Sequence, residues 1–157
     1  SQSSSSSSCS SSSSSASFDP TNKYTKGDYI TLPSGTVDLE VVYSANEYLE
    51  VEQNDAQFVD QSATYQYAIH QFRQRNSSSI QQTVDILVDV RSSIGATTQP
   101  VYLQVLNRST GIWETLDSNN SAGVNKEFTL VGKVTNSLNN YYDTSYWVAF
   151  RVYQHTN

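Results

Sequence analysis

The chain has 157 residues, with nine Lys and Arg against fifteen Asp and Glu, and a formal net charge of −6. This acidic balance argues against nucleic-acid binding, which needs a basic surface, and no apolar run approaches the roughly 20 residues of a membrane span. Only 15% of residues are charged, so polarity comes mainly from Ser, Thr, Asn, Gln and Tyr, a composition that suits an extracellular or cell-surface location and contact with sugars.

Residues 1–17 form a serine-rich arm, in which every residue of 1–15 except Gln2 and Cys9 is serine. Such a segment has no apolar face and cannot offset its ordering entropy by burial, so we expect a linker unless sugars or a neighbouring surface order it. Cys9 is the single cysteine and has no intrachain partner, which leaves an incidental residue or an intermolecular bridge open. Candidate O-glycosylation sites are Ser3, Ser4, Ser5, Ser6, Ser7, Ser8, Ser10, Ser11, Ser12, Ser13, Ser14 and Ser15.

Residues 18–35 read as an extended transition segment between turn formers such as Asp19-Pro20 and Pro33-Ser34-Gly35. A short strand is expected within it. Its apolar side chains are predicted anchors for contact with a neighbouring subunit: Tyr24, Tyr29, Ile30 and Leu32.

From residue 36 to 157, apolar and polar residues alternate with period 2, the signature of half-buried strands. Strands are predicted over 37–43, 48–51, 65–69, 80–90, 101–105, 112–116, 128–134 and 146–152, with one helical turn within 54–63. The pattern predicts an all-β, antiparallel β-sandwich that is jelly-roll-like. The predicted core comprises Val84, Ile86, Val88, Leu103, Val105, Phe150 and Val152.

Two runs carry a resemblance to a known class of domain. VYLQVLNRSTGIWETL (101–116) and YYDTSYWVAFRVYQ (141–154) resemble the C-terminal half of jelly-roll, galactose-binding-like domains of secreted bacterial proteins. Such domains, often called carbohydrate-binding modules, also occur beside serine-rich linkers. The resemblance covers about a third of the chain and supports the fold more than the ligand, because this fold hosts many roles.

Signals for enzyme chemistry are weak. His70 and His155 stand outside zinc-ligand spacings, and the sequence holds no nucleophile elbow, Walker loop or dinucleotide fingerprint. A hydrolase with paired carboxylates stays open, since two acids need no local motif. The acidic stretch 47–60 lacks a calcium-loop pattern and reads as a solvated loop. We therefore expect no enzyme, cofactor or metal.

Aromatic residues are more informative, because flat rings stack on sugars and are enriched at protein contacts. If Val148, Phe150 and Val152 face inward, then Trp147, Ala149, Arg151 and Tyr153 share the other face of their strand, unless both faces are buried. The candidate partner or sugar contacts are Trp113, Tyr141, Tyr142, Trp147, Arg151 and Tyr153. N-glycosylation sequons fall in predicted turns at Asn76, Asn107 and Asn119.

Two function hypotheses follow. The first is a structural subunit of an extracellular filament or surface layer, in which copies of the chain contact one another through the N-terminal arm. The second is a carbohydrate-binding module on a plain serine tether, with polysaccharide as its partner. The contacts of the arm and its following segment would separate the two.

Overall fold

The structure is a computed structural model that describes residues 22–35, 37–52, 59–63, 66–75 and 83–156. The serine arm with its candidate glycosylation sites, Cys9 and the sequon at Asn76 therefore lie outside the described residues. Contacts between Cα atoms divide the chain into two compact units, one of residues 1–22 and 43–59 and the other of residues 23–42 and 60–157. Each unit is described separately below.

The smaller unit contains helix α1 (Ala45–Glu52). Its first turn is closed by a capping box, in which Ser44 Oγ accepts from the Glu47 N–H (3.3 Å) and Glu47 Oε2 accepts from the Ser44 N–H (2.8 Å). The rings of Tyr43 and Tyr48 meet edge to face at 5.9 Å. The strand predicted over 48–51 is thus wrong, because the capping residues start a helix there. No described helix is long and apolar enough to cross a membrane.

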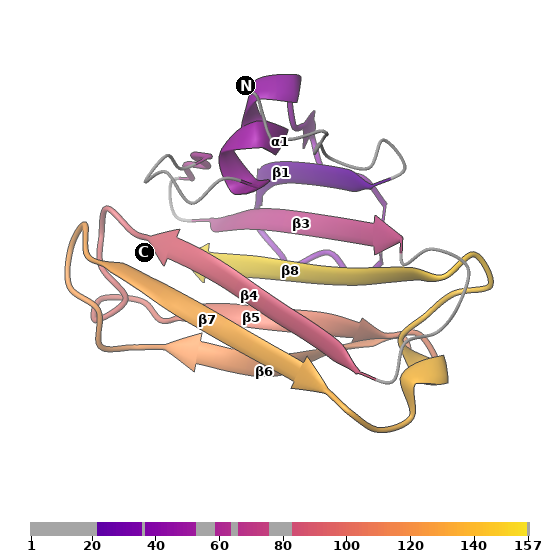
Figure 1. The fold of residues 1–157 in the computed structure, drawn as a ribbon. Helices are drawn as coiled ribbons and strands as arrows, with labels where there is room; N and C mark the ends of the chain where they lie inside the picture. The colour runs from indigo at the N-terminus through magenta and orange to yellow at the C-terminus, as the bar shows by residue number, and fades with distance from the viewer. Residues whose placement is uncertain (1–21, 36, 53–58, 64–65, 76–82, 157) are drawn as a thin grey trace. The chain divides into compact units, whose positions relative to one another are not determined.

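The larger unit holds all the described strands (Figure 1). These are β1 (Lys23–Tyr29), β2 (Val41–Val42), β3 (Tyr67–Arg75), β4 (Val84–Arg91), β5 (Val101–Asn107), β6 (Ile112–Asn119), β7 (Glu127–Val134) and β8 (Trp147–His155), with a short 3-10 helix η2 (Leu138–Asn140) before β8. One sheet has the order β2-β1-β3-β8-β5-β6 and the other pairs β4 with β7. Every pairing is antiparallel. The predicted all-β fold class is confirmed.

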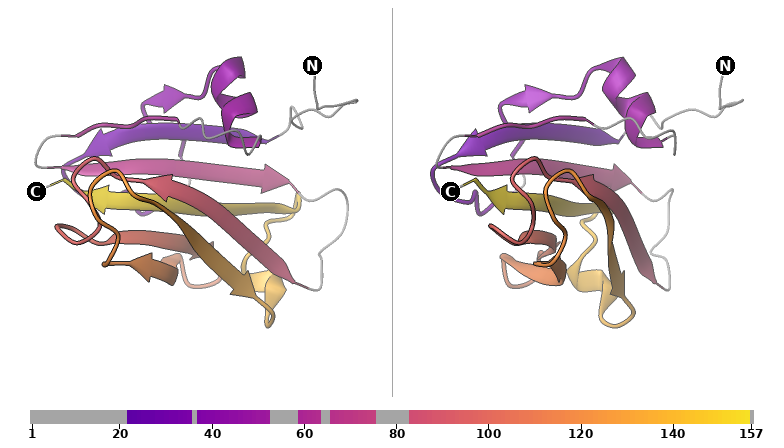
Figure 2. Two further views of the ribbon diagram at one scale, coloured as in Figure 1. Left: turned by 60° about the vertical axis from the view of Figure 1, so that its left-hand side comes forward. Right: turned by 90° about the vertical axis from the view of Figure 1, so that its left-hand side faces the viewer.

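The two sheets form a sandwich, with the β4–β7 ribbon lying across one face of the larger sheet (Figures 1 and 2). We call this the inner face. Gly132 of β7 marks the close approach, because a Cβ there would lie 2.5 Å from Leu116 Cδ1 of β6 and 3.1 Å from Leu103 Cδ2 of β5. At the same place Val131 N–H donates to Asp117 Oδ2 of β6 at 2.9 Å. The ribbon is therefore tied to the β5–β6 side of the larger sheet.

The core between the sheets matches the predicted set closely. Val84, Ile86, Leu103, Val105, Phe150 and Val152 are buried, and Val88 is half-buried. The Phe72 ring continues this core along β3, stacked on Phe150 at 4.9 Å. Strands β5 and β6 are joined by a turn, in which Asn107 Oδ1 accepts from the N–H groups of Ser109 and Thr110.

The strand predicted over 37–43 is mostly absent. Only Val41 and Val42 form β2, while the preceding residues run across the sheet instead of along it. The alternation of Val37, Leu39 and Val41 gave the wrong expectation. The backbone of residues 37–39 forms hydrogen bonds with side chains of β1 and β3 and not with the backbone of a neighbouring strand. Those contacts define the outer face described next.

Candidate functional site

The outer face of the larger sheet, turned away from the β4–β7 ribbon, carries a row of buried polar side chains. Cross-strand pairing aligns Thr25 of β1, Gln71 of β3, Arg151 of β8 and Gln104 of β5. Each of the four is between 1% and 8% exposed. Buried polar groups are costly unless they are hydrogen-bonded, so this row needs a polar cover.

Arg151 is the cation in the middle of this row. Its Nη1 donates to Pro33 O at 2.6 Å and its Nε donates to Gln104 Oε1 at 2.9 Å. The guanidinium also lies 4.2 Å from the centre of the Trp113 ring. Burial lowers the pKa of Arg151 from its ordinary value to about 10. Carbonyl oxygens and a ring face thus hold this charge, and no ion pair to it is found within the described residues.

The cover is the chain's own segment 33–39, here called the strap, in which residue 36 is outside the described part. Pro33 O and Ser34 O accept from Arg151 and from Trp113 Nε1, the latter at 3.1 Å. Further along, the strap is tied to β3 and then to β1. There Gln71 Nε2 donates to Val37 O at 3.0 Å, and the Leu39 N–H donates to Thr25 Oγ1 at 3.1 Å.

Ion pairs of one carboxylate also attach the strap to the sheet. Asp38 forms ion pairs with Lys23 of β1 at 2.6 Å and with Arg73 of β3 at 3.2 Å. From its first residue to its last, the strap thus bonds to β8, β6, β3 and β1. The outer face of β8 is therefore covered, at Arg151, by the same chain.

The two tryptophans among the predicted contact residues lie under arginines. Trp113 is half-buried beneath Arg151, and its Nε1 is bonded to Ser34. Trp147 is half-buried, with Arg73 Cζ 5.4 Å from its ring centre. One face of each ring is therefore already occupied by an arginine side chain. A sugar that stacked on that face would have to displace the arginine.

The tyrosines predicted with them are spread over the molecule. The Tyr141 hydroxyl donates to Glu114 Oε1 at 2.7 Å, and this bond raises the pKa of Tyr141. Tyr142 is buried and faces the groove described below. Tyr153 lies on the outer face of β8, where burial raises its pKa. The structure thus does not join Tyr141, Tyr142 and Tyr153 into one platform.

An aromatic cluster that the sequence did not predict surrounds Tyr153. Tyr102 of β5 stacks on Tyr153 at 5.3 Å, and Tyr67 of β3 meets it edge to face at 5.7 Å. His155 packs on Tyr67 at 4.7 Å. All four rings are half-buried. Alternation along each strand indicates which face Tyr102 and Tyr67 occupy. Their contact with Tyr153, however, depends on β5 and β3 being the neighbours of β8.

The predicted assembly anchors are divided between β1 and the residues that connect it to the strap. Tyr24 and Tyr29 belong to β1, which pairs with β3 of the same chain. The Tyr29 hydroxyl accepts from the Glu40 N–H at 2.9 Å, and burial raises the pKa of Tyr29. Ile30 is 77% exposed, and Leu32 is half-buried. Whether these residues contact a neighbour stays a prediction.

The two described sequons differ in their surroundings. Asn107 is 7% exposed, and its Nδ2 donates to Glu114 Oε2 at 2.8 Å, a bond that an N-glycan would have to replace. Asn119 is half-buried, and its Oδ1 accepts from the N–H groups of Ser121 and Ala122. Its Nδ2 is not used in those two bonds, so Asn119 is the more suitable acceptor of the two.

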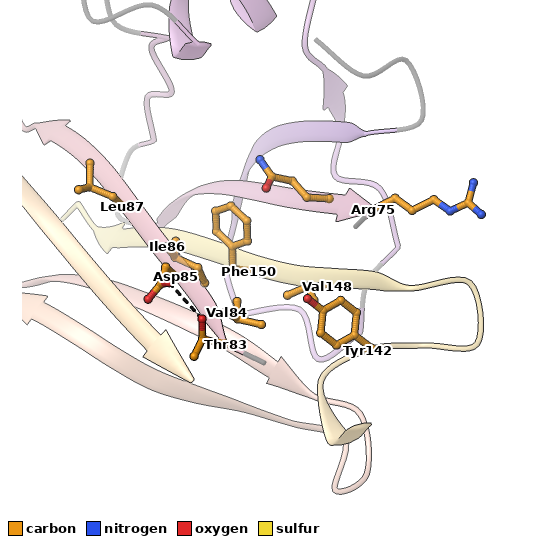
Figure 3. A pocket seen from close by; sticks show the side chains of 10 residues that line it. Arg75, Thr83, Val84, Asp85, Ile86, Leu87, Tyr142, Val148 and Phe150 are labelled. Atoms are coloured by element: carbon orange, nitrogen blue, oxygen red, sulfur yellow. Dashed lines mark hydrogen bonds between the residues drawn. The ribbon is translucent and has the colours of Figure 1, made fainter. Parts of the chain in front are cut away.

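An open groove runs beside β4 (Figure 3). Its volume is about 400 Å³, within the roughly 300–1,000 Å³ of many ligand sites. Val148 and Phe150 of β8, Tyr142, and Val84 and Ile86 of β4 give it an apolar part. The polar part is formed by Gln74, Arg75, Thr83 and Asp85.

The groove borders a strand edge that has no partner strand within the described part of the chain. β4 pairs with β7 on one side only, and the smaller sheet ends there. Alternate residues of an edge strand direct their N–H and C=O groups outward. This edge with its groove can bind an extended peptide by main-chain hydrogen bonds, so it is the second candidate site.

Neither a metal-binding group nor a known relative points to a function. A cluster of three His, Cys, Asp or Glu side chains that could hold a metal ion is not found among the described residues. No protein-family model matches the sequence, and no curated protein and no solved structure shows significant similarity to it. The inference of function therefore rests on the geometry of the groove and the outer face.

Proposed function

We propose that this domain is a structural subunit of an extracellular assembly, a filament or surface layer, in which copies contact one another through the N-terminal arm. The observation that carries the proposal is the edge of β4, which borders a groove and has no partner strand among the described residues. Open edges of this kind accept extended segments from other chains. The weakly charged, serine-rich composition is consistent with an extracellular setting.

Removal of residues 1–21 tests the proposal. The truncation must stop there, because Lys23–Tyr29 form β1, and their loss would open the edge of β3. We expect the full chain to form filaments or higher oligomers under the electron microscope and by sedimentation. The truncated chain should stay monomeric, with an unchanged circular dichroism spectrum. A monomeric full chain at high concentration, or filaments of the truncated chain, would contradict the proposal.

Carbohydrate binding is the second candidate, supported by the aromatic cluster of Tyr67, Tyr102 and Tyr153 on the outer face. It agrees with the resemblance of 101–116 and 141–154 to carbohydrate-binding modules. Affinity electrophoresis through gels containing soluble polysaccharides tests it. We expect Tyr102→Ala to abolish any retardation that the native chain shows, while Tyr146→Ala, a half-buried tyrosine that the aromatic cluster does not include, should keep it. No retardation in any polysaccharide, or equal retardation of Tyr102→Ala, would remove this candidate.

A further inference from the structure

We propose that the groove along β4 receives the N-terminal arm of a second copy of this chain, as a strand added to the smaller sheet. The inference rests on the proposed assembly function and adds where on the neighbour the arm binds. Among the described residues, six strands lie in the larger sheet and two in the smaller. An even division of an eight-stranded jelly roll would give four and four, so the smaller sheet has space for added strands.

The shape of the site favours a single extended segment over a second folded sheet. The larger sheet continues beyond β8 through β3, β1 and β2. Figure 1 shows that β4 lies on this side of β7. Gln74 and Arg75 of β3 line the groove together with Val148 and Phe150 of β8. Two copies paired edge to edge through β4 would bring their larger sheets into the same space. One peptide strand, in contrast, needs only the groove.

The chemistry of the arm suits this site. Strand addition obtains its affinity from main-chain hydrogen bonds, which a serine tract supplies at every residue because it contains no proline. Small side chains fit a groove of about 400 Å³ beside Phe150 and Ile86. The arm carries no charged residue before Asp19, so it brings no unpaired charge next to Asp85 and Arg75.

The length of the arm is also sufficient. The 21 residues before Asn22 can span roughly 70 Å when extended, whereas Thr83–Leu87 occupy roughly 15 Å of groove. Enough chain remains to connect two folded domains. Each copy then has one arm and one groove, a head-to-tail contact that does not close on itself and therefore builds a filament.

Cross-linking through the native cysteine tests the site in the full chain. Cys9 is the only cysteine, so an introduced cysteine gives a defined second position. Thr83→Cys, Asp85→Cys and Leu87→Cys place a thiol along β4, and Ile112→Cys places one on β6 at a side chain that is 61% exposed. Each variant is treated with a short bismaleimide, and a Cys9→Ser version serves as background.

We expect Cys9 to link to the β4 positions of another chain at least fivefold more than to position 112. Several β4 positions should react, since a uniform serine tract specifies its register weakly. Polymers whose links favour position 112, or none of these positions, would overturn the groove assignment and leave the proposed function standing. Cross-links within one chain would show that the arm in the groove does not come from a second copy. A monomeric, unlinked chain would remove both the assignment and the proposed function.

Discussion

Arg151 shows how one side chain stabilises the outer face. A guanidinium satisfies the Pro33 and Gln104 oxygens in its own plane while it stacks on the Trp113 ring. Lysine carries the same charge on a compact ammonium group, which lacks the planar shape and the several N–H donors of a guanidinium. The position therefore requires arginine for its shape as well as for its charge.

We predict that Arg151→Lys lowers the free energy of unfolding by about 2–4 kcal/mol, because a buried charge loses its hydrogen bonds and its stacking. Urea unfolding followed by tryptophan fluorescence measures this, and Trp113 itself reports the site. Arg91→Lys is the matched control, since Arg91 is exposed and should change stability by less than about 0.5 kcal/mol. Equal effects of the two substitutions would contradict the role assigned to Arg151.

The tyrosines predict how stability depends on alkaline pH. Burial raises the pKa of Tyr153 and of Tyr29, and the bond to Glu114 raises the pKa of Tyr141. The unfolded chain, with tyrosine pKa values of about 10, then loses these protons first. Their stabilisation is complete below about pH 10 and is lost as the pH rises through the folded values. Arg151 acts in the opposite sense, because its folded pKa of about 10 lies below the ordinary value of an arginine.

Ultraviolet absorbance of tyrosinate isolates the tyrosine part of this dependence. We expect part of the tyrosine signal of the folded protein to appear at higher pH than in the protein unfolded by urea. Tyr153→Phe should remove one of the late-titrating groups. Superimposable titrations of folded and unfolded protein would contradict the assignment.

Residue-scale features divide sharply in how well the sequence predicts them. Period-2 alternation correctly placed Phe150 and Val152 inside and Arg151 on the other face of β8. It did not predict what covers Arg151, because the strap reaches it from Pro33, far away along the chain. Alternation reports which face a side chain occupies, whereas the partners on that face depend on long-range pairing.

At the scale of elements, the ribbon and the larger sheet meet closely at Gly132. An added methyl group would lie 2.5 Å from Leu116 Cδ1 and 3.1 Å from Leu103 Cδ2, so neighbours in the core must shift. We predict that Gly132→Ala destabilises the protein by about 1–3 kcal/mol, the usual cost of overpacking, in thermal or urea unfolding. Gly35→Ala is the control, because a Cβ there has no atom within 4 Å. Destabilisation of both variants alike would refute close packing as the cause.

Elements were predicted well where hydrophobic alternation is long and poorly where local polar contacts decide. β4, β5, β7 and β8 were expected from their alternation. Helix α1 was not, because the apolar Tyr48 and Leu49 indicate a strand. The cap formed by Ser44 and Glu47 starts a helix there instead. The capping box was nevertheless present in the sequence as Ser-x-x-Glu, and it was the signal that could have found the helix.

At the scale of the whole domain, the sequence predicted an antiparallel sandwich but not an unequal division of its strands. Strand order is set by pairings between segments far apart, such as β3 with β8 and β5 with β8. Neither composition nor alternation indicates which distant strands pair with one another. The edge of β4 and its groove follow from that order, so the proposed acceptor site could not be read from the sequence alone.

Backbone chemistry gives the strongest test of assembly at this scale. If the arm adds to β4 as a strand, its N–H groups matter more than its side chains. Proline removes an N–H and cannot donate to a ladder, whereas alanine keeps it. Two full-length variants compare these effects by changing the same serines, to proline in one and to alanine in the other. The changed serines include odd and even positions, because alternate residues of a strand direct their N–H groups to opposite edges: Ser4, Ser5, Ser7, Ser8, Ser11 and Ser12.

We predict that the alanine variant assembles like the native chain and that the proline variant stays monomeric in sedimentation and electron microscopy. Both should keep the native circular dichroism spectrum, because the substitutions precede β1, the first described strand. The comparison also separates strand addition from contacts made by sugars on the serines, since alanine removes the same hydroxyl groups that proline does. Assembly lost in both variants would point to the serine side chains or their glycans. Assembly retained in both would rule out the arm as a hydrogen-bonded strand.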